Sequence, residues 1–354
     1  MLDLLCAEQR RCLSDHLKGV LRRELSTGVP ASLAGPMAEM VLGGGKRLRP
    51  QLCIWTYRQL AGDGGGETPA AVLDVACTWE LFHAFLLVHD DLIDAADVRR
   101  GRPTLQRLLD RPGADAGSGE RLALVAGDLL FSAATAVLHK LDLPCDVWRS
   151  LLTTFSRIAK TTGLGQAMDL AHCDDAGPVT EQKLLREYHW KTAAYTFEGP
   201  MLSGAILAGL SEAARERLSC FAIALGQAYQ IHNDLADLCR QVHVGSDLAR
   251  RKRTVALERG RRQLKPAQRR EFDRQWDALA HANGEMLTMA EALRQELLAA
   301  GAVEQTQTLI GELLEKASGA ANDSAVPAAL RHGLLQLQES LRRNYFATAL
   351  PVSP

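Results

Sequence analysis

The sequence has almost no net charge and few aromatic residues. Its 354 residues include 41 lysines and arginines against 42 aspartates and glutamates, and only 5% of them are aromatic. A protein that binds nucleic acid by neutralising phosphates usually carries a basic excess, so this balance argues against a nucleic-acid partner. The hydrophobic content of 47% excludes a disordered chain.

Paired cysteines and long apolar runs are also missing. The eight cysteines form no Cys-x-x-Cys pair and lie mostly in apolar stretches, where a thiol packs as a small hydrophobic side chain. They predict reduced packing residues in a cytoplasmic protein. The first ten residues are interrupted by charges and lack the apolar centre of a signal peptide. No run of about 18 apolar residues is free of charge, so we predict no membrane span.

Strand signals are scarce, because sustained Val/Ile/Thr alternation and hairpin turns between such runs are absent. Segments of roughly 12–30 residues rich in Ala, Leu, Glu, Gln and Arg show helical periodicity instead. Glycine and proline predict breaks between them at 43–45, 62–66, 101–103, 111–119, 163–165, 176–178 and 241–247. None of these is a long linker. We therefore predict an all-α fold in a single domain spanning residues 1–354.

Two of the predicted helices are apolar on all sides, which is typical of inner helices. Both nevertheless end in acids. Residues 70–94 finish in His-Asp-Asp-Leu-Ile-Asp (89–94), and residues 218–237 finish in Asn-Asp-Leu-Ala-Asp (233–237). We call these the first and the second acidic motif.

The first acidic motif combines several electrostatic penalties. Asp90 and Asp94 are four residues apart and project from one helix face, with Asp91 about 100° round. Like charges repel at this spacing, carboxylates oppose the dipole at a helix C-terminus, and burial of unpaired charge is costly. A cation relieves all three, and Mg²⁺ binds through one or two carboxylates plus substrate phosphates. The alternative is an exposed helix end whose acids pair with arginines. A second acidic motif at the end of a second inner helix argues against it.

Basic residues accompany the acids. Gly-Gly-Gly-Lys-Arg-Leu-Arg-Pro (43–50) presents Lys46 and Arg49, and Arg99 and Arg100 follow the first acidic motif. Arginine binds diphosphate bidentately and lysine binds it as a point charge. The glycines do not form a P-loop, because the Gly-x-x-x-x-Gly-Lys-Ser/Thr pattern is not matched and no strand precedes them. The combination indicates a diphosphate substrate without a nucleotide-binding fold.

The order of the motifs resembles that of the short-chain trans-polyprenyl diphosphate synthases. After the basic block come Glu-Leu-Phe-His (80–83), the first acidic motif with its arginines, Ala-Gly-Asp (126–128) and Gly-Gln-x-x-Asp (165–169). Lys-Thr-Ala (191–193), Gln230 with the second acidic motif, Gly-x-Asp (245–247) and Lys-x-Thr (252–254) complete the series. The resemblance covers residues 43–254. It implies the isoprenoid synthase helical bundle with a central cavity, in which helices over 261–346 belong to the same domain.

The resemblance implies an activity and a role for each matching residue. The activity is Mg²⁺-dependent condensation of isopentenyl diphosphate with dimethylallyl, geranyl or farnesyl diphosphate, releasing pyrophosphate. The isopentenyl diphosphate would be held by Lys46, Arg49, His83 and Arg100. The allylic diphosphate would be held by Arg99, Lys191 and Lys252. The metal ligands would be Asp90, Asp94, Asn233 and Asp237, with Asp91 and Asp234 close by. Thr192 and Gln230 would line the reacting centre.

Asn233 stands where the family's second motif begins with aspartate. Its amide oxygen can ligate Mg²⁺ but brings no charge. The pattern also resembles the Asn-Asp-x-x-Ser-x-x-x-Glu motif of class I terpene cyclases, although Asp237 and Gln241 occupy the serine and glutamate positions. A cyclase holds one diphosphate, whereas this chain keeps all four residues that would hold isopentenyl diphosphate. That argues for a coupling enzyme. The five carboxylates of the two motifs argue against a third alternative, a low-activity partner subunit.

Product length depends on residues that precede Asp90. Phe85 and Phe82 lie about 7.5 and about 12 Å below it along a helix. An aromatic residue at Phe85, a non-aromatic Leu86 and an uninterrupted first motif resemble geranylgeranyl more than farnesyl diphosphate synthases. On a helical wheel, Leu86 and Leu87 face the metal side more directly than Phe85 does. The alternative interpretation of Phe82 and Phe85 is that they are ordinary core residues. The resemblance further implies three Mg²⁺ ions and a homodimer.

Overall fold

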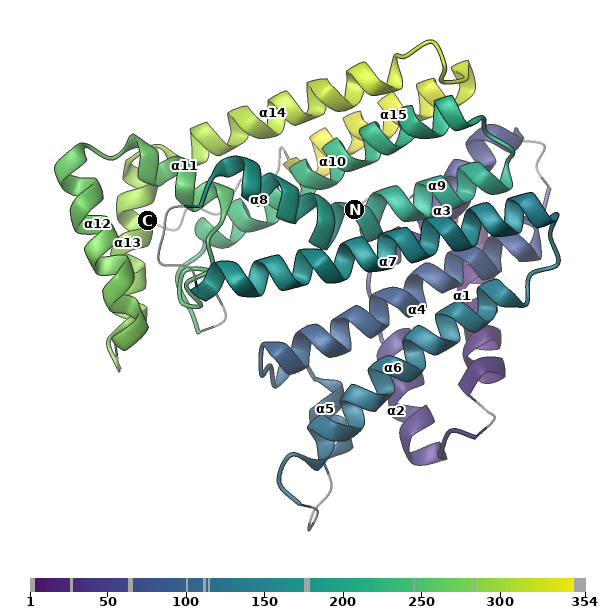
Figure 1. Cartoon of the computed structure of the whole chain (residues 1–354), viewed down its shortest axis with the longest axis horizontal. Helices are drawn as coiled ribbons and strands as arrows, with labels where there is room; N and C mark the ends of the chain where they lie inside the picture. Colours follow the sequence, from purple (N-terminus) through teal and green to yellow (C-terminus); the bar gives the residue numbers. More distant parts are fainter. Residues whose placement is uncertain are drawn as a thin grey trace. The chain divides into compact units, whose positions relative to one another are not determined.

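Helices make up nearly all the regular structure of the chain (Figure 1). The computed structural model describes residues 4–25, 28–62, 66–99, 101–110, 113, 115–174, 179–244, 246–282 and 284–346. Within these residues the only strands are β1 (Val98–Arg99) and β2 (Arg102–Pro103), which pair antiparallel with Val98 opposite Pro103. The all-α prediction is therefore confirmed.

The chain forms two compact units. The N-terminal unit comprises Leu2–Ser156 and Gly199–Ser211, and the C-terminal unit comprises Arg157–Glu198 and Glu212–Pro354. The expectation of a single domain stays a prediction.

The N-terminal unit is built round one inner helix, α4 (Ala70–Ile93). Trp79, which is 1% exposed, donates through its indole N–H to the Ser203 hydroxyl over 3.0 Å. Its ring, Phe82 and Phe85 belong to an aromatic cluster that also includes Phe131 and Phe155. The helices that surround α4 are α1 (Ala7–Leu25), α2 (Ala31–Leu42), α3 (Leu48–Ala61), α5 (Leu105–Leu109), α6 (Ser118–His139), the start of α7 (Cys145–Asp174) and α9 (Gly199–Leu207).

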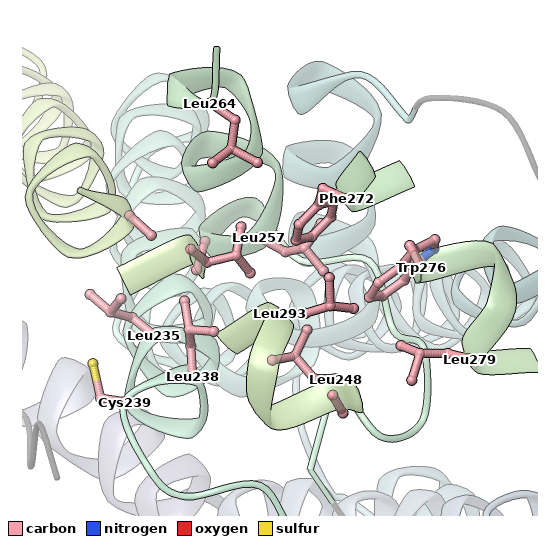
Figure 2. Packing of buried hydrophobic residues seen from close by; sticks show 14 residues of the cluster. Leu235, Leu238, Cys239, Leu248, Leu257, Leu264, Phe272, Trp276, Leu279 and Leu293 are labelled. Carbon is pink, nitrogen blue, oxygen red and sulfur yellow. The ribbon is translucent and has the colours of Figure 1, made fainter. Parts of the chain in front are cut away.

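The C-terminal unit has its own inner helix, α10 (Glu212–Leu238). Figure 2 shows how Leu235 and Leu238, the apolar side chains near its C-terminal end, pack into a cluster that includes Leu257, Phe272 and Leu293. The remaining elements are α8 (Glu181–Tyr188), the π-helix η1 (His189–Glu198), α11 (Val255–Gln263), α12 (Pro266–Ala278), η2 (Leu279–His281), α13 (Met286–Ala299), α14 (Ala302–Ala321), α15 (Ala328–Leu341) and the π-helix η3 (Arg342–Phe346). The two predicted inner helices are thus the cores of the two units.

The predicted break at residues 163–165 is wrong, because α7 continues through it. Gly165 is needed for packing: a Cβ atom there would lie 2.2 Å from the backbone nitrogen of Lys191. Its hydrogen lets η1 lie against α7. A glycine that permits close helix contact leaves the same mark in a sequence as one that ends a helix.

Two further expectations need adjustment. Cys53, Cys77 and Cys239 are buried as predicted, but four other cysteines are exposed: Cys6, Cys12, Cys145 and Cys220. Burial raises the pKa of the Cys53 thiol, which suits an inert packing residue. Among the described helices, α4 and α6 are long and apolar enough to cross a membrane, but 72% of the apolar window of α4 is buried inside the protein. That value identifies α4 as a core helix.

The packing of Gly165 predicts opposite effects for two alanine substitutions in α7. Gly165→Ala should lower the unfolding free energy by about 1–3 kcal/mol, because η1 has to move. Gly163→Ala is the matched control, since its Cβ would meet nothing within 4 Å and alanine favours a helix by up to about 1 kcal/mol. Urea denaturation measures both. Equal effects would show that Gly165 has no packing role.

Candidate active site

The first acidic motif lies at the C-terminal end of α4. Asp91 is 4% exposed, Asp90 is half-buried and Asp94 is exposed as the C-cap residue, its N–H donating to the Asp90 carbonyl over 2.9 Å. Arg99 on β1 donates to Asp91 Oδ1 over 2.7 Å and to Asp90 Oδ2 over 3.3 Å. Burial raises the pKa of the Asp91 carboxyl, and Arg99 opposes that rise. One arginine therefore pairs with two carboxylates of the motif and offsets part of their charge.

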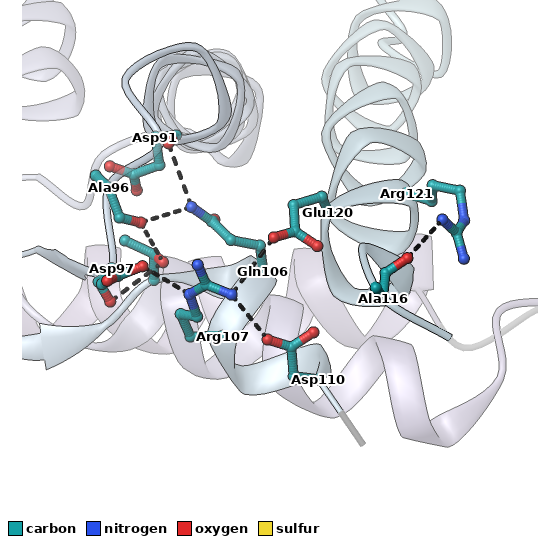
Figure 3. Close-up of polar contacts among 10 residues, drawn as sticks. Asp91, Ala96, Asp97, Gln106, Arg107, Asp110, Ala116, Glu120 and Arg121 are labelled. Atoms are coloured by element: carbon teal, nitrogen blue, oxygen red, sulfur yellow. Dashed lines mark hydrogen bonds and ion pairs between the residues drawn. The ribbon is translucent and has the colours of Figure 1, made fainter. Parts of the chain in front are cut away.

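A buried glutamine fixes the turn after this motif (Figure 3). Gln106 Nε2 donates to the carbonyls of Asp91 and Ala96 over 3.2 and 2.6 Å. The Thr104 hydroxyl donates to the same Ala96 carbonyl over 2.8 Å. Arg107 adds an ion pair to Asp97 at 2.7 Å. These bonds hold β1, and with it Arg99, beside the end of α4.

The basic loop before α3 is fastened to α4 by an ion pair. Arg47 has a left-handed backbone with φ of 47°, and its guanidinium donates to the buried carboxylate of Glu80. Gln51 holds the carbonyl of Lys46 over 2.6 Å. Because His83 follows Glu80 by three residues, it lies on the same face of α4. The loop thus presents Lys46 at the surface and leads into α3, whose second residue is the half-buried Arg49.

A cavity of about 260 Å³ connects this loop with the first acidic motif within the N-terminal unit. Gly43 and Gly44 line it on one side, and Asp91 and Arg99 line it on another. Leu87 contributes an apolar wall. The cavity therefore joins charged and apolar surfaces, as a ligand with a charged head and a hydrocarbon tail requires.

In the C-terminal unit, hydrogen bonds connect three predicted site residues in series. The Thr192 hydroxyl donates to Gln230 Oε1 over 3.1 Å, and Gln230 Nε2 donates to Asp234 Oδ1 over 2.7 Å. Lys252 Nζ lies 3.9 Å from the same Asp234 oxygen and 3.8 Å from Asp247. Burial raises the pKa of Asp234 to about 6, although Lys252 opposes the rise. Asp234 Oδ2 is buried and has no hydrogen-bond partner within the described residues.

Two buried acids set the position of Lys191. Lys191 forms an ion pair with Asp169 on α7, and Asp169 is hydrogen-bonded to Glu187, which is 2% exposed. Burial and the neighbouring Asp169 raise the pKa of Glu187 to about 8. Burial also acts on Asp169, but Lys252 and Lys191 lower its pKa below the ordinary value. Glu187 therefore keeps its proton at neutral pH and donates to an ionised Asp169.

Asp237 and Asn233 of the second motif also have hydrogen-bond partners inside the C-terminal unit. Asp237 Oδ2 accepts the Asp247 N–H over 2.8 Å, and Asn233 Oδ1 accepts the hydroxyl of Tyr345 from η3. No group of three or more His, Cys, Asp or Glu side chains in the described part of the chain is arranged to hold a metal by itself. The donor set still suits Mg²⁺, which takes only one or two protein carboxylates and completes its shell with phosphate and water oxygens.

The structure therefore divides the predicted residues between the units. The N-terminal unit holds Lys46, Arg49, His83, Phe85, Asp90, Asp91, Asp94 and Arg99. The C-terminal unit holds Lys191, Thr192, Gln230, Asn233, Asp234, Asp237 and Lys252. Arg100 and the Gly245 of the Gly-x-Asp motif lie outside the described residues.

Sequence reasoning assigned no role to Glu80, Gln106, Asp169, Glu187 or Tyr345. Glu80 and Asp169 lie inside recognised motifs. The motifs identify these two residues but do not predict which side chains they pair with. Glu187 precedes Lys191 by four residues, a spacing that places both on one helix face. Tyr345 is 112 residues from Asn233 and lies in no motif.

Comparisons with known proteins agree with the resemblance seen in the sequence. The model of the polyprenyl synthetase family matches residues 30–293. The short chain isoprenyl diphosphate synthase of Methanothermobacter thermautotrophicus is 32% identical over 68% of this chain and 71% of its own. The farnesyl diphosphate synthase of Geobacillus stearothermophilus is 32% identical over 59% of this chain and 67% of its own.

A solved structure extends the likeness to the fold. The geranylgeranyl pyrophosphate synthase of Corynebacterium glutamicum, in complex with isoprenyl diphosphate and magnesium, has a TM-score of 0.80 and 25% identity. The match covers 96% of this chain and 99% of that one. The expected helical bundle is therefore confirmed.

The proton held by Glu187 predicts a pH dependence of stability. The unfolded chain loses this proton near pH 4.5 and the folded chain loses it near pH 8. The contribution of Glu187 to the unfolding free energy is therefore complete below pH 4.5 and is lost as the pH rises to about 8. Glu187→Gln keeps a donor toward Asp169, so its stability should fall less over this window.

Urea denaturation at a series of pH values measures the difference. Glu304→Gln, on the exposed side of α14, is the control and should keep the slope of the parent protein. If the unfolding free energy of Glu187→Gln changed with pH as steeply as that of the wild type, Glu187 would already be ionised at low pH.

Proposed function

Because the chain belongs to the polyprenyl synthetase family, we propose that it couples isopentenyl diphosphate to an allylic diphosphate and releases pyrophosphate. It is a prenyltransferase, and its proposed product is geranylgeranyl diphosphate. The observation that carries the proposal is the presence of two separate basic sets. Lys46 stands on the loop fastened to the His83 face of α4 and Arg49 in the first turn of α3, whereas Arg99 is paired with Asp90 and Asp91. Coupling needs a second diphosphate site, whereas cyclisation of one substrate does not.

We propose the metal ligands from the chemistry of their oxygens. Asp90 and Asp94 in the first motif, with Asp237 and Asn233 in the second, would hold Mg²⁺ together with diphosphate oxygens, and three ions are proposed. Bound Mg²⁺ neutralises the diphosphate as it leaves the allylic carbon. Arg99 can turn from Asp90 and Asp91 to this diphosphate, because carboxylate and phosphate both accept its planar fork.

The chain's own groups complete the proposed reaction. Lys191, fixed by Asp169, and Lys252 would hold the allylic diphosphate while its C–O bond breaks. The oxygens of Thr192 and Gln230 would stabilise the positive charge that develops on carbon, since their hydrogen bond already fixes their positions. The isopentenyl double bond attacks that carbon, and the departing pyrophosphate accepts the final proton. No side-chain nucleophile is needed.

One feature favours the class I cyclase as a second candidate. Asn233 is neutral where the family's motif is acidic, and cyclases carry asparagine at this point. A low-activity subunit remains the third candidate. We also propose a homodimer and a cytoplasmic location, as the resemblance and the cysteine pattern predict.

Purified protein with Mg²⁺, isopentenyl diphosphate and farnesyl diphosphate separates the three candidates. A prenyl diphosphate longer than farnesyl, identified by mass, supports the synthase. A hydrocarbon formed from farnesyl diphosphate alone identifies a cyclase. No turnover with any allylic substrate indicates a subunit.

In this assay Asp90→Ala should abolish turnover, because the allylic diphosphate then lacks a metal ligand and Arg99 loses one of its two carboxylate partners. The control is Asp142→Ala, which removes an exposed carboxylate between α6 and α7 and should retain activity. Wild-type turnover in Asp90→Ala would contradict the metal assignment.

Phe85→Ala should lengthen the product, because it removes a ring that lies below Asp90 along α4. Phe85 packs against Phe82 and Phe131 at 5.7 and 5.2 Å, so some stability will be lost as well. Phe155→Leu is the control: Phe155 packs on Phe82 at 5.4 Å in the same cluster and should leave chain length unchanged. Mass analysis of the products decides. An unaltered distribution in Phe85→Ala would remove Phe85 as the floor of the pocket.

A further inference from the structure

The helix η3 places an aromatic side chain on the second acidic motif. The Tyr345 hydroxyl donates to Asn233 Oδ1. Its ring is stacked on Tyr229, with centroids 4.8 Å apart and an angle of 9°, and its centroid is 4.6 Å from that of His232. These three partners share one face of α10, because they are spaced by three and four residues. Tyr345 therefore covers the face on which the second motif begins.

The contact extends beyond one side chain. Phe346 also packs on His232, with ring centroids 5.4 Å apart. The buried His232 side chain therefore meets both aromatic rings. Tyr345 is half-buried. Two consecutive aromatic residues thus attach η3 to α10.

This arrangement occupies the oxygen that a metal would need. Mg²⁺ requires a nearly ideal octahedral shell at about 2.0–2.1 Å and retains several waters. An Mg²⁺ ion at Asn233 Oδ1 would need room for such a shell, and the Tyr345 hydroxyl stands against the same oxygen. The contact therefore competes with ligation of Mg²⁺ by Asn233.

We propose that Tyr345 is a latch: it holds η3 on α10 through its contacts with Asn233 and Tyr229, and Mg²⁺ with a diphosphate displaces it from Asn233. The inference rests on the proposed function, since it assumes that Mg²⁺ and diphosphate bind at the second motif. The neutral amide suits this role. A hydroxyl binds a neutral oxygen about half as strongly as a charged one, so the latch opens more easily than it would from an aspartate.

The first test compares the full-length wild type with Tyr345→Phe, which keeps the ring and removes the donor. Mg²⁺ is titrated at a fixed concentration of inorganic pyrophosphate, and binding is followed by calorimetry. Tyr345→Phe should reach half-saturation at about fivefold lower Mg²⁺, which corresponds to a net hydrogen bond of about 1 kcal/mol. Tyr57→Phe in α3 makes the same chemical change in the N-terminal unit and should bind Mg²⁺ as the wild type does.

The second test follows η3 directly. Arg342 and Arg343 are exposed at its start, so trypsin can remove the residues that follow when the helix opens. Mg²⁺ with pyrophosphate should accelerate this cleavage in the wild type. Tyr345→Phe and Asn233→Ala should both be cleaved faster without ligand. The double variant should add nothing further, because both changes remove the same bond.

The outcomes separate this inference from the proposed function. Weaker Mg²⁺ binding in Tyr345→Phe would show that Tyr345 supports Asn233 as a ligand, which overturns the latch. Equal binding with equal cleavage would reduce Tyr345 to a packing residue and overturn the latch alone. Absence of any binding of Mg²⁺ with pyrophosphate, in the wild type and the variants, would overturn both proposals.

Discussion

Carboxylates at the ends of two apolar helices have to be neutralised, and the organisation of both units depends on how this is done. α4 and α10 bury apolar side chains on all sides, so their acidic ends cannot all reach water. Arg99 pairs with Asp90 and Asp91 and offsets part of their charge. In α10, Lys252 lies 3.9 Å from Asp234 and Gln230 donates to the same Asp234 oxygen, while the Asp247 N–H donates to Asp237. Each motif therefore has compensating partners within its own unit.

The neutralising groups share a second property, which is that a diphosphate complex can replace or recruit them. Arg99 makes its fork of hydrogen bonds to carboxylates or to phosphates with the same geometry. Lys191 is held by Asp169. This carboxylate is ionised because the one proton of the Asp169–Glu187 pair stays on Glu187. Two carboxylates this close cannot both ionise without cost, so the protonated Glu187 orients Asp169 and adds no charge. The arrangement thus fixes the position of the Lys191 side chain, as its proposed contact with the allylic diphosphate requires.

The sequence predicted the parts of the structure that depend on local spacing. The inner helices followed from apolar residues on every side, and the face shared by Asp90 and Asp94 followed from the helical repeat. Gly165 was misinterpreted because a break and a close helix contact both require glycine, and only the nearby Lys191 backbone distinguishes them. The pairing of Arg47 with Glu80 and of Tyr345 with Asn233 joins residues 33 and 112 positions apart. No periodicity connects positions at such distances, so tertiary structure alone could reveal them.

Asn233 illustrates why a departure from a family motif need not be a loss. An aspartate here would add a carboxylate next to Asp234, whose pKa burial has already raised to about 6. Repulsion and burial would then penalise the ligand-free chain twice. The amide avoids both penalties, and its oxygen is satisfied by the Tyr345 hydroxyl. The amide oxygen that we propose as a weaker metal ligand is thereby also a neutral anchor for η3, so asparagine at this position both lowers the charge of the site and connects η3 to it.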